Sequence, residues 1–332
     1  MGSDMYYDHA GVRSTTENGV VKTEPMSGVL TWEEHAKHGS VPRLSRQSFL
    51  SRIGNVSELV GKGIPIVEYG PGSMEDAHRL IEATQSKLYM PADISEGIIE
   101  QASELAATVK GCEIRPAIID LFAGNNTPLI EEPALAALLG LTITNIRGPV
   151  PRSEPKNALV SAFNSLAKPI GIGGGYLLVS THSEQDGERN VHLYSEKWHR
   201  RFGVNFLYRM QAELPMQDFN PDHFEYNPVW HEHCSLLAHT VRATKDQTFT
   251  MGEFGETKIF VRAGDVFHYN NSFKYKPAFF EDCAKLAGLR AIQKWQDDNG
   301  MAIYLFEVSP RLRLELAPRL SMARQSSQLA AR

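Results

Sequence analysis

The sequence predicts an α/β fold, in which a mainly parallel sheet is covered by helices on both faces and carries an inserted unit of a more antiparallel kind. From residue 64 to residue 183, short apolar runs alternate with stretches of helical periodicity. Such alternation is typical of strand–helix–strand units that build a parallel sheet. From about residue 185 the pattern changes to helical segments and then to alternating strands, before a helix and a strand close the chain.

The periodicity of the apolar residues predicts each element in turn. Short apolar runs predict strands over 64–69, 87–93, 113–122, 173–183 and 300–308. Helical spacing of apolar residues predicts helices over 47–62, 74–84, 94–109, 153–170, 191–214 and 276–295. The run 134–148 starts helical or apolar and ends in a β-branched strand, and 224–253 alternates like antiparallel strands.

These changes of pattern divide the chain into five predicted segments. They are an irregular N-terminal arm (1–46), the main α/β domain (47–184), an inserted domain (185–274) that the arm is expected to join, the return to the main domain (275–308) and an Arg-rich tail (309–332). The tail is a candidate contact through which copies of the chain would form an oligomer.

Composition and charge argue against several classes of protein. The chain has 34 Lys and Arg residues against 39 Asp and Glu residues, and its formal net charge of −5 argues against a nucleic-acid partner. No apolar run reaches the roughly 18 residues of a membrane span, so we expect no membrane association. The N-terminus lacks the pattern of a secretion signal and only three cysteines occur, which favours the reducing cytoplasm.

The first predicted strand ends in a glycine-containing turn, EYGPGS (residues 68–73), whose glycines allow the backbone to approach a ligand closely. A dinucleotide-binding turn would have a third glycine, where this chain has Glu75, followed by Asp76. Two acids would repel a pyrophosphate, so the turn favours a cationic ligand without phosphate, such as S-adenosylmethionine (SAM). The alternative is an ordinary strand–turn–helix connection without a ligand, because short glycine motifs often occur by chance.

Two further acids lie at the ends of predicted strands. Asp93 closes the second strand, about 20 residues beyond the glycine turn, where a carboxylate can accept hydrogen bonds from ribose hydroxyls. Asp120 lies near the end of the third strand, where a carboxylate can meet an adenine amino group. Each acid alone is also a common helix cap or loop residue. Acids at three successive strand ends nevertheless indicate a site, because open α/β sheets bind ligands at the carboxyl ends of their strands.

Two other patterns carry weaker signals. The run His231-Glu232-His233-Cys234 has metal-binding residue types, but on a strand Cys234 would point away from the two histidines. Ser73 and Ser272 lack the sequence context of a hydrolase nucleophile. We therefore expect neither a metal site nor serine hydrolysis.

Several longer segments match sequence blocks of a known protein family. EYGPGS, YMPADISEG and LLGLTITNIRG match blocks of a cofactor fold, while FGVNFLYRMQAEL with FNPDHFEY, and SFKYKPAFFEDCAKLAGLRAIQKWQDDNG, come from outside it and are more specific. On these segments the chain, from about Tyr6 to Val308, resembles the histidine-specific SAM-dependent methyltransferases, which include the ergothioneine-pathway histidine Nα-methyltransferases and the fungal dimethylallyltryptophan N-methyltransferases. The resemblance implies a Rossmann-like class I SAM-dependent methyltransferase sheet with an inserted α+β substrate domain.

The resemblance also implies roles for the residues at matching positions. The SAM cofactor would be lined by Glu68, Gly70, Gly72, Ser73, Asp93, Asp120 and Leu121, with Gly140 beneath its methionine part. The carboxylate and amine of the substrate would be held by Tyr7, Asn145 and Tyr194, and its side chain would be contacted by Ser272.

The substrate pocket departs from the family pattern. Asn270 stands where the histidine enzymes have a Glu that grips the imidazole, and His239 stands where they have a Met. Ser40-Val41-Pro42 replaces Tyr-Tyr-Pro, Thr144 replaces a Gly, and Asp76 replaces a Lys. Loss of a charged partner and a Tyr weakens imidazole recognition by roughly 2–4 kcal/mol. We therefore expect a larger, indole- or tryptophan-derived small molecule of secondary metabolism as the substrate.

Methyl transfer to an amine requires a free lone pair on nitrogen, and burial next to the positively charged sulfonium would lower the amine pKa. If the nucleophile is instead an indole carbon or ring nitrogen, a nearby base or hydrogen-bond acceptor would help. The candidates are His9, His239 and Asn270. Three alternatives stay open: a histidine Nα-methyltransferase of the ergothioneine type, a nicotinamide oxidoreductase, and a non-catalytic SAM-binding scaffold subunit. Glu75 in place of the third glycine argues against the oxidoreductase.

Overall fold

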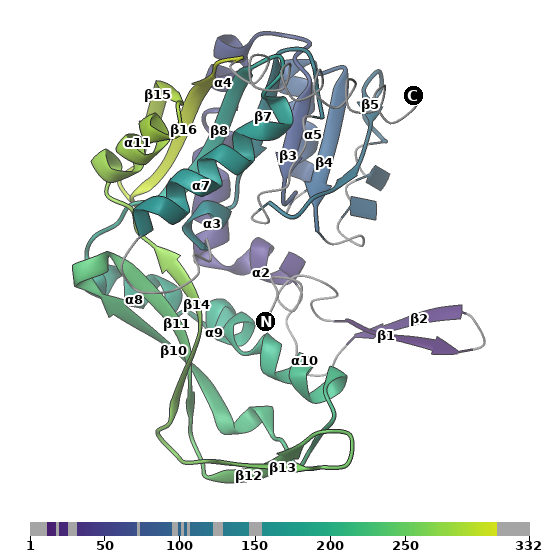
Figure 1. The fold of residues 1–332 in the computed structure, drawn as a ribbon, viewed down its shortest axis with the longest axis vertical. Helices are drawn as coiled ribbons and strands as arrows, with labels where there is room; N and C mark the ends of the chain where they lie inside the picture. Colours follow the sequence, from purple (N-terminus) through teal and green to yellow (C-terminus); the bar gives the residue numbers. More distant parts are fainter. Residues whose placement is uncertain are drawn as a thin grey trace, which may run out of the picture.

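The computed structural model describes residues 12–17, 20–25, 32–71, 74–94, 99–100, 103–104, 107–121, 129–145 and 155–310 (Figure 1). Its main sheet has the strand order β15-β16-β8-β7-β3-β4-β5, with β6 paired beside β4. The strands are β3 (Ile66–Tyr69), β4 (Leu88–Asp93), β5 (Glu113–Ile114), β6 (Ala117–Ile118), β7 (Ala134–Leu138), β8 (Gly175–His182), β15 (Arg290–Gln296) and β16 (Met301–Val308). Neighbours among β3, β4, β7 and β8 run parallel, whereas β16 is antiparallel to both of its neighbours.

Helices cover both faces of this sheet, which explains why its central strands are apolar without alternation. On one face, α7 (Pro155–Ala167) and α11 (Pro277–Leu286) contribute Phe163 and Phe280 to the core. The opposite face is covered by α3 (Ser40–Leu50), α4 (Ile53–Val60) and α5 (Met74–Thr84). Figure 1 shows α7 crossing the face that is turned toward the viewer. The sheet and its two helical layers confirm the predicted Rossmann-like α/β class.

The sheet reverses its direction of growth at β3. From β3 the chain proceeds to β4 and β5 on one side, and it then crosses over to β7, which pairs with the other edge of β3. Open α/β sheets bind ligands at such a switch point, outside the carboxyl ends of the strands. The fold therefore positions the residues that follow Tyr69 and Leu138 beside one another at a ligand-binding edge.

A second group of elements lies beyond these carboxyl ends (Figure 1). Its sheets have the orders β10-β11-β14 and β13-β12-β9, and its core contains Leu207, Phe219, Val241 and Phe249. The elements are α8 (Gly187–Tyr194), α9 (Lys197–Gly203), α10 (Asn205–Glu213), β9 (Met216–Gln217), β10 (Phe224–His231), β11 (Leu236–Ala243), β12 (Gln247–Met251), β13 (Thr257–Val261) and β14 (Val266–Phe273).

The remaining elements are short or lie toward the N-terminus. An antiparallel hairpin is formed by β1 (Val12–Glu17) and β2 (Val20–Pro25), and it is followed by α2 (Trp32–His38). The described part of the chain also contains the 3₁₀ helices η1 (Thr142–Asn145), η2 (Lys168–Ile170), η3 (Pro221–His223) and η4 (Glu232–Cys234). None of the helices in the described part of the chain is long and apolar enough to cross a membrane.

The structure corrects four local predictions. Residues 134–148 begin with strand β7 and continue into η1, because a strand buried on both faces shows the same apolar run as a buried helix. The predicted helix 276–295 ends at Leu286, and after Gly288 (φ +81°) the chain forms the edge strand β15. The predicted strand 113–122 splits into β5 and β6 around Arg115-Pro116. Residues 32–38 and 40–46, expected to be irregular, are helical, and 40–46 run directly into the predicted helical residues 47–50.

Candidate active site

Glu68 lies inside the main sheet, on β3, and is 3% exposed. The Tyr89 hydroxyl on β4 donates a hydrogen bond of 2.9 Å to its Oε2 atom. Burial raises the pKa of Glu68 to about 7, against the opposing effect of this hydrogen bond. Glu68 therefore titrates near neutral pH, beside the turn that follows β3.

The turn after β3 brings a glycine against the end of β4. Gly70 has φ +59°, which favours glycine, and its N–H donates to the carbonyl of Ala92 at 2.9 Å. A Cβ atom at Gly70 would lie 3.7 Å from the Asp93 carboxylate, so this side chain borders the turn. The predicted neighbours Gly72 and Ser73 lie outside the described residues.

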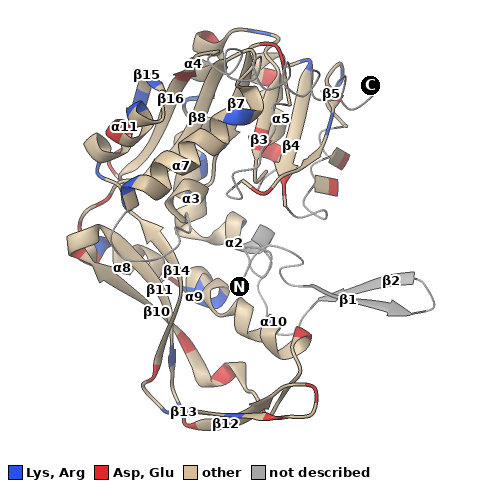
Figure 2. Ribbon diagram, in the orientation of Figure 1, with Lys and Arg blue, Asp and Glu red and all other residues tan. Residues whose placement is uncertain are grey.

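The predicted acids end neighbouring strands. Asp93 is half-buried at the end of β4, where it pairs in register with Ile118 of β6. Asp120 follows two residues later and is exposed, and Leu121 beside it is half-buried. Figure 2 shows acidic residues on β3 and at the end of β4. The structure thus places Glu68 on β3, Asp93 at the end of β4 and Asp120 two residues beyond β6, and these three strands are neighbours in the sheet.

The strand on the other side of β3 ends in an unusual turn. Gly140 and Leu141, after β7, both have left-handed backbone angles, with φ +71° and +66°. The N–H of Leu141 donates to the Ser180 hydroxyl at 3.2 Å, which anchors the turn to β8. No atom within the part of the chain that the structure describes lies within 4 Å of a Cβ atom placed on Gly140. The described residues therefore leave the Cβ side of Gly140 open, where the cofactor's methionine part is predicted to pass.

The two acids at the start of α5 are paired. Arg46 of α3 contacts the Glu75 carboxylate at 2.6 Å through Nη2, and its Nε donates to Asp76 at 2.7 Å. Arg79 pairs with Glu75 as well, at 2.7 Å. These guanidinium groups offset the negative charge that the sequence alone assigns to the turn. These paired acids therefore give the turn little preference for a cationic ligand, and that expectation is left to the strand-end acids Asp93 and Asp120.

A buried polar cluster connects the second group of elements to the main sheet. Lys274, fully buried just after β14, donates from Nζ to the Tyr194 hydroxyl at 2.7 Å and to the Ser272 hydroxyl at 2.8 Å. The Ser272 hydroxyl lies 3.3 Å from that of Thr144 on η1. The Thr144 hydroxyl in turn lies 3.2 Å from Oδ1 of Asn145. We call Lys274, Tyr194, Ser272, Thr144 and Asn145 the lysine cluster.

The structure thus brings together three predicted substrate residues, Asn145, Tyr194 and Ser272, from three separate elements. The prediction missed Lys274, which joins two of them. The sequence signal was present, since Lys274 lies in the segment SFKY that carries the resemblance. Periodicity alone cannot identify it, because a lysine is almost always an exposed residue.

His239 lies near the lysine cluster, on β11. It is 5% exposed, and its Nδ1 is 2.7 Å from the Tyr226 hydroxyl. Its ring centroid lies 5.6 Å from that of Tyr194 and 5.9 Å from that of His199. Burial lowers the pKa of His239 to about 3, and the charge of Lys274 acts in the same direction. His239 is therefore a neutral imidazole at physiological pH.

Of the other two predicted catalytic residues, Asn270 lies within the described part of the chain and His9 does not. Asn270 lies on β14 and is half-buried, and its Oδ1 accepts a hydrogen bond from the backbone of Asn271 at 2.9 Å. His9 and the predicted substrate residue Tyr7 lie outside the described residues. Among the residues that are described, no group of three His, Cys, Asp or Glu side chains is placed to hold a metal ion.

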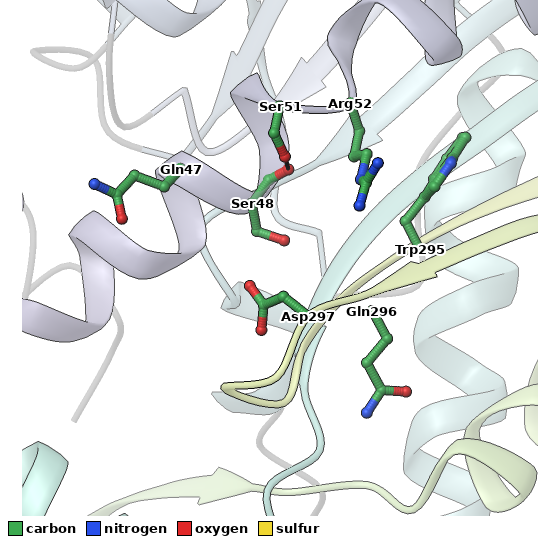
Figure 3. Close-up of a pocket in the computed structure, with 7 residues that line it drawn as sticks. All are labelled: Gln47, Ser48, Ser51, Arg52, Trp295, Gln296 and Asp297. Atoms are coloured by element: carbon green, nitrogen blue, oxygen red, sulfur yellow. Dashed lines mark hydrogen bonds between the residues drawn. The ribbon is translucent and has the colours of Figure 1, made fainter.

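A separate cavity of about 220 Å³ lies between the end of α3 and the turn that follows β15. Figure 3 shows its lining side chains, which are mostly polar and belong to Gln47, Ser48, Ser51, Arg52, Trp295, Gln296 and Asp297. None of the predicted site residues lines it.

Comparison with known proteins gives matches of different strength. The model of the family described as "Histidine-specific methyltransferase, SAM-dependent" matches residues 48–308. An uncharacterised protein of Sinorhizobium fredii, y4iF, is 28% identical over 256 residues, which cover 74% of this chain and 81% of that protein.

Two solved structures are similar at a greater distance. A SAM-dependent methyltransferase from Clostridium acetobutylicum is 12% identical, with a TM-score of 0.43 over 80% of this chain and 92% of its own. The CcbJ methyltransferase from Streptomyces caelestis is 12% identical, with a TM-score of 0.46 over 81% of this chain and 96% of its own.

Proposed function

Because the chain belongs to the family of histidine-specific SAM-dependent methyltransferases, we propose that it transfers a methyl group to the amine of a small aromatic molecule derived from an amino acid. The cofactor of this family is SAM, and its members are enzymes of methyl transfer. The observation that carries the proposal is the lysine cluster, which joins Asn145, Tyr194 and Ser272 next to the Gly140 turn.

For the cofactor, we propose the strand-end residues predicted from sequence. When bound, SAM supplies a methyl group on a positively charged sulfur. Glu68, Asp93 and Asp120 would hold it with Leu121, while the glycine turns at Gly70 and Gly140 would allow close approach of the backbone. Gly72 and Ser73 are proposed in the same role. The adjacency of β3, β4, β6 and β7 at the switch point supports this assignment.

For the substrate, Asn145, Tyr194 and Tyr7 are proposed to hold the polar groups around the amine, with Ser272 beside them. His9, His239 and Asn270 stay the candidates for a base or hydrogen-bond acceptor near the nucleophile. The pKa of about 3 makes the His239 imidazole a weak proton acceptor, so it suits a hydrogen-bonding role better than that of a general base.

An indole- or tryptophan-derived substrate of secondary metabolism is our first candidate. A neutral amide at Asn270 lacks the charge that would favour an imidazole. The rings of Tyr194, His199 and His239 pack against one another, and Tyr194 belongs to the lysine cluster. Aromatic side chains beside the proposed substrate site support an aromatic ligand. Histidine is the second candidate, and the family's own description favours it.

We also propose the division of the chain predicted from sequence, with a SAM-binding domain over 47–184 and 275–308 and a substrate unit over 185–274. The separate sheets of the two regions support it. Action in the cytoplasm and oligomer formation through the tail 309–332 stay predictions from sequence.

The proposed function is tested by incubating the purified protein with SAM and, separately, with L-histidine, L-tryptophan, tryptamine and prenylated tryptophan. We expect release of S-adenosylhomocysteine and a product heavier by one or more methyl groups with an indole compound. Turnover of L-histidine alone would select the second candidate. If none of the compounds is methylated although SAM binds, an indole or histidine amine is not the substrate.

A further inference from the structure

Lys274 is a buried lysine with an unusual set of partners. Its exposed fraction is 0%, and its Nζ donates to two hydroxyl groups, those of Tyr194 and Ser272, at 2.7 and 2.8 Å. Within the described residues it forms no ion pair with an Asp or a Glu. Lysines are seldom buried without a compensating charge, because desolvation of an ammonium group costs several kcal/mol. A side chain that only links two hydroxyl groups for structural support need not be a lysine.

The direction of the hydrogen bonds follows from the chemistry of the amino group. The Lys274 Nζ donates both bonds, so Tyr194 and Ser272 each accept from it. Their own protons are then turned toward other atoms. The remaining hydroxyl contacts in the lysine cluster are long, at 3.4 Å between Tyr194 and Ser272 and 3.3 Å between Ser272 and Thr144.

Thr144 is an acceptor for one of these protons. Its own hydroxyl donates to the carbonyl of Leu141 at 2.7 Å, so in its 3.3 Å contact with Ser272 the Thr144 oxygen accepts. Among the residues that the structure describes, the Tyr194 proton has only the longer contact of 3.4 Å with Ser272. The Tyr194 proton is therefore the one that is available to a ligand.

We propose that Lys274 is a positioning residue, which occupies a lone pair of Tyr194 and one of Ser272 and thereby turns the Tyr194 hydroxyl proton toward a hydrogen-bond acceptor of the substrate. The inference rests on the proposed function and deepens it. The preferred acceptor is an anionic oxygen, because a negative charge at this place favours the ammonium form of the amino group behind the two hydroxyls. A substrate that keeps a carboxylate would therefore bind better than the corresponding decarboxylated amine.

The groups around Lys274 are consistent with a site that binds an anion. His182, His199 and His239 all have pKa values lowered by burial and, in part, by the charge of Lys274, so they are neutral at physiological pH. Burial likewise lowers the pKa of Lys274 itself. An anion bound at the Tyr194 hydroxyl would favour the ammonium form again and strengthen both donated bonds.

The first test compares Lys274→Met and Lys274→Arg with Lys276→Met, a matched control at an exposed lysine two residues away. SAM affinity is measured by calorimetry, and methyl transfer to L-tryptophan and L-histidine is measured from pH 6 to pH 10. We expect Lys274→Met to raise KM for the amino acid at least tenfold, with SAM affinity within twofold, a changed pH profile and partial rescue in Lys274→Arg. An unchanged KM, or an equal loss of SAM affinity, would overturn the proposal.

A second test does not depend on turnover or on the folding of Lys274→Met. Protein with ¹⁵N-labelled lysines is studied by NMR, and Ser272→Ala and Tyr194→Phe are compared with Lys276→Met. Both cluster variants should move the same lysine Nζ resonance, which the control should leave in place. L-tryptophan, added with S-adenosylhomocysteine, should move this resonance more than tryptamine does.

The two proposals fail in different ways. An Nζ resonance that is unaffected by Ser272→Ala and Tyr194→Phe would overturn the role of Lys274, whatever the enzyme methylates. A resonance that responds to both variants and to L-tryptophan, in a protein that methylates none of the tested amines, would support the role of Lys274 and contradict the proposed function.

Discussion

His239 on β11 and Asn270 on β14 are register partners in neighbouring antiparallel strands. The pairing shifts immediately afterwards, between His239 and Thr240. On the far side of β11, Tyr226 of β10 binds the His239 imidazole through a hydrogen bond of 2.7 Å. Two residues predicted to act on the substrate thus lie opposite one another, and a charge introduced at one will act on the other.

The first prediction follows from this pairing. Asn270→Glu should shift the ratio of kcat/KM for L-histidine over L-tryptophan at least tenfold toward L-histidine, because a carboxylate binds an imidazole more strongly than an amide does. Steady-state kinetics with both amino acids measure the ratio. Asn271→Glu, on the adjacent position of β14, is the control and should leave the ratio unchanged. An unchanged ratio in Asn270→Glu would exclude this position from the substrate pocket.

Asp93→Ala should weaken SAM binding by roughly 10- to 150-fold, since a hydrogen bond to a charged group contributes about 1.5–3 kcal/mol. Asp93 borders the Gly70 turn, where its carboxylate would contact the ligand. Calorimetric titration with SAM gives the affinity. Glu113→Ala, which removes an exposed acid from β5 of the same sheet, serves as the control. Equal affinity in Asp93→Ala and in the unmodified protein would contradict the cofactor assignment.

Arg46→Ala should lower the free energy of unfolding by about 1 kcal/mol, because it removes the ion pairs that join α3 to the first turn of α5. The effect should shrink at high salt. Urea unfolding of the variant at two ionic strengths measures both. The double variant Arg46→Glu with Asp76→Lys should recover part of the loss seen in Arg46→Glu alone. Arg115→Ala, which removes an exposed pair with Glu113, should change stability by less than roughly 0.5 kcal/mol.

Glu68 should make stability depend on pH. Its pKa is raised to about 7 in the folded state, above that of an exposed glutamate, so the folded state holds the proton more tightly. The resulting stabilisation is complete below about pH 4.5 and is lost as the pH rises to about 7, with a total of roughly 3 kcal/mol.

Glu68→Gln isolates this contribution, because the Tyr89 hydroxyl can still donate to the amide oxygen. The buried imidazoles titrate in both proteins, so the difference in unfolding free energy between them reports on Glu68. Urea unfolding at intervals from pH 4 to pH 8 measures the difference, which should grow in favour of the variant as the pH rises. A difference that is constant over this range would show that Glu68 keeps an ordinary pKa.

Gly203→Ala should destabilise the protein by about 1–3 kcal/mol, as overpacking of a close contact does. A Cβ atom at Gly203 would lie 2.4 Å from the ring of Tyr226, which holds His239. Thermal unfolding measures the loss. Gly54→Ala is the matched control, because no described atom lies within 4 Å of its Cβ position and Gly54 is in helix α4, so stability should rise by up to about 1 kcal/mol. Equal melting temperatures for the two variants would contradict the prediction.

The sequence predicted the parallel core well, because short apolar runs that end in glycines or acids have few other structures available to them. It failed at β7, where ALAAL is buried on both faces and shows no alternation. It also failed at β15, which continues from a helix after a single glycine turn. In both cases the neighbouring strands determine the outcome, and periodicity contains no information about neighbours.

The site was predictable to a similar extent. The acids at strand ends could be located because the carboxyl ends of parallel strands share one edge. The pairing of Arg46 with Asp76 could not, because the two residues are 30 positions apart and meet only through the packing of α3 on α5. The burial of Lys274 could not be predicted from the sequence either, because it depends on elements that are distant in the chain and meet only in the fold.

The consecutive left-handed residues Gly140 and Leu141 affect how fast a ligand can bind. A leucine in this conformation is strained by about 1 kcal/mol or more, and its hydrogen bonds to Ser180 and Thr144 keep it there before any ligand arrives. The conformational entropy of this turn is therefore lost when the chain folds and not when a ligand binds. Association at this strand end should then proceed without a slow rearrangement of the backbone, at a rate set by diffusion and access.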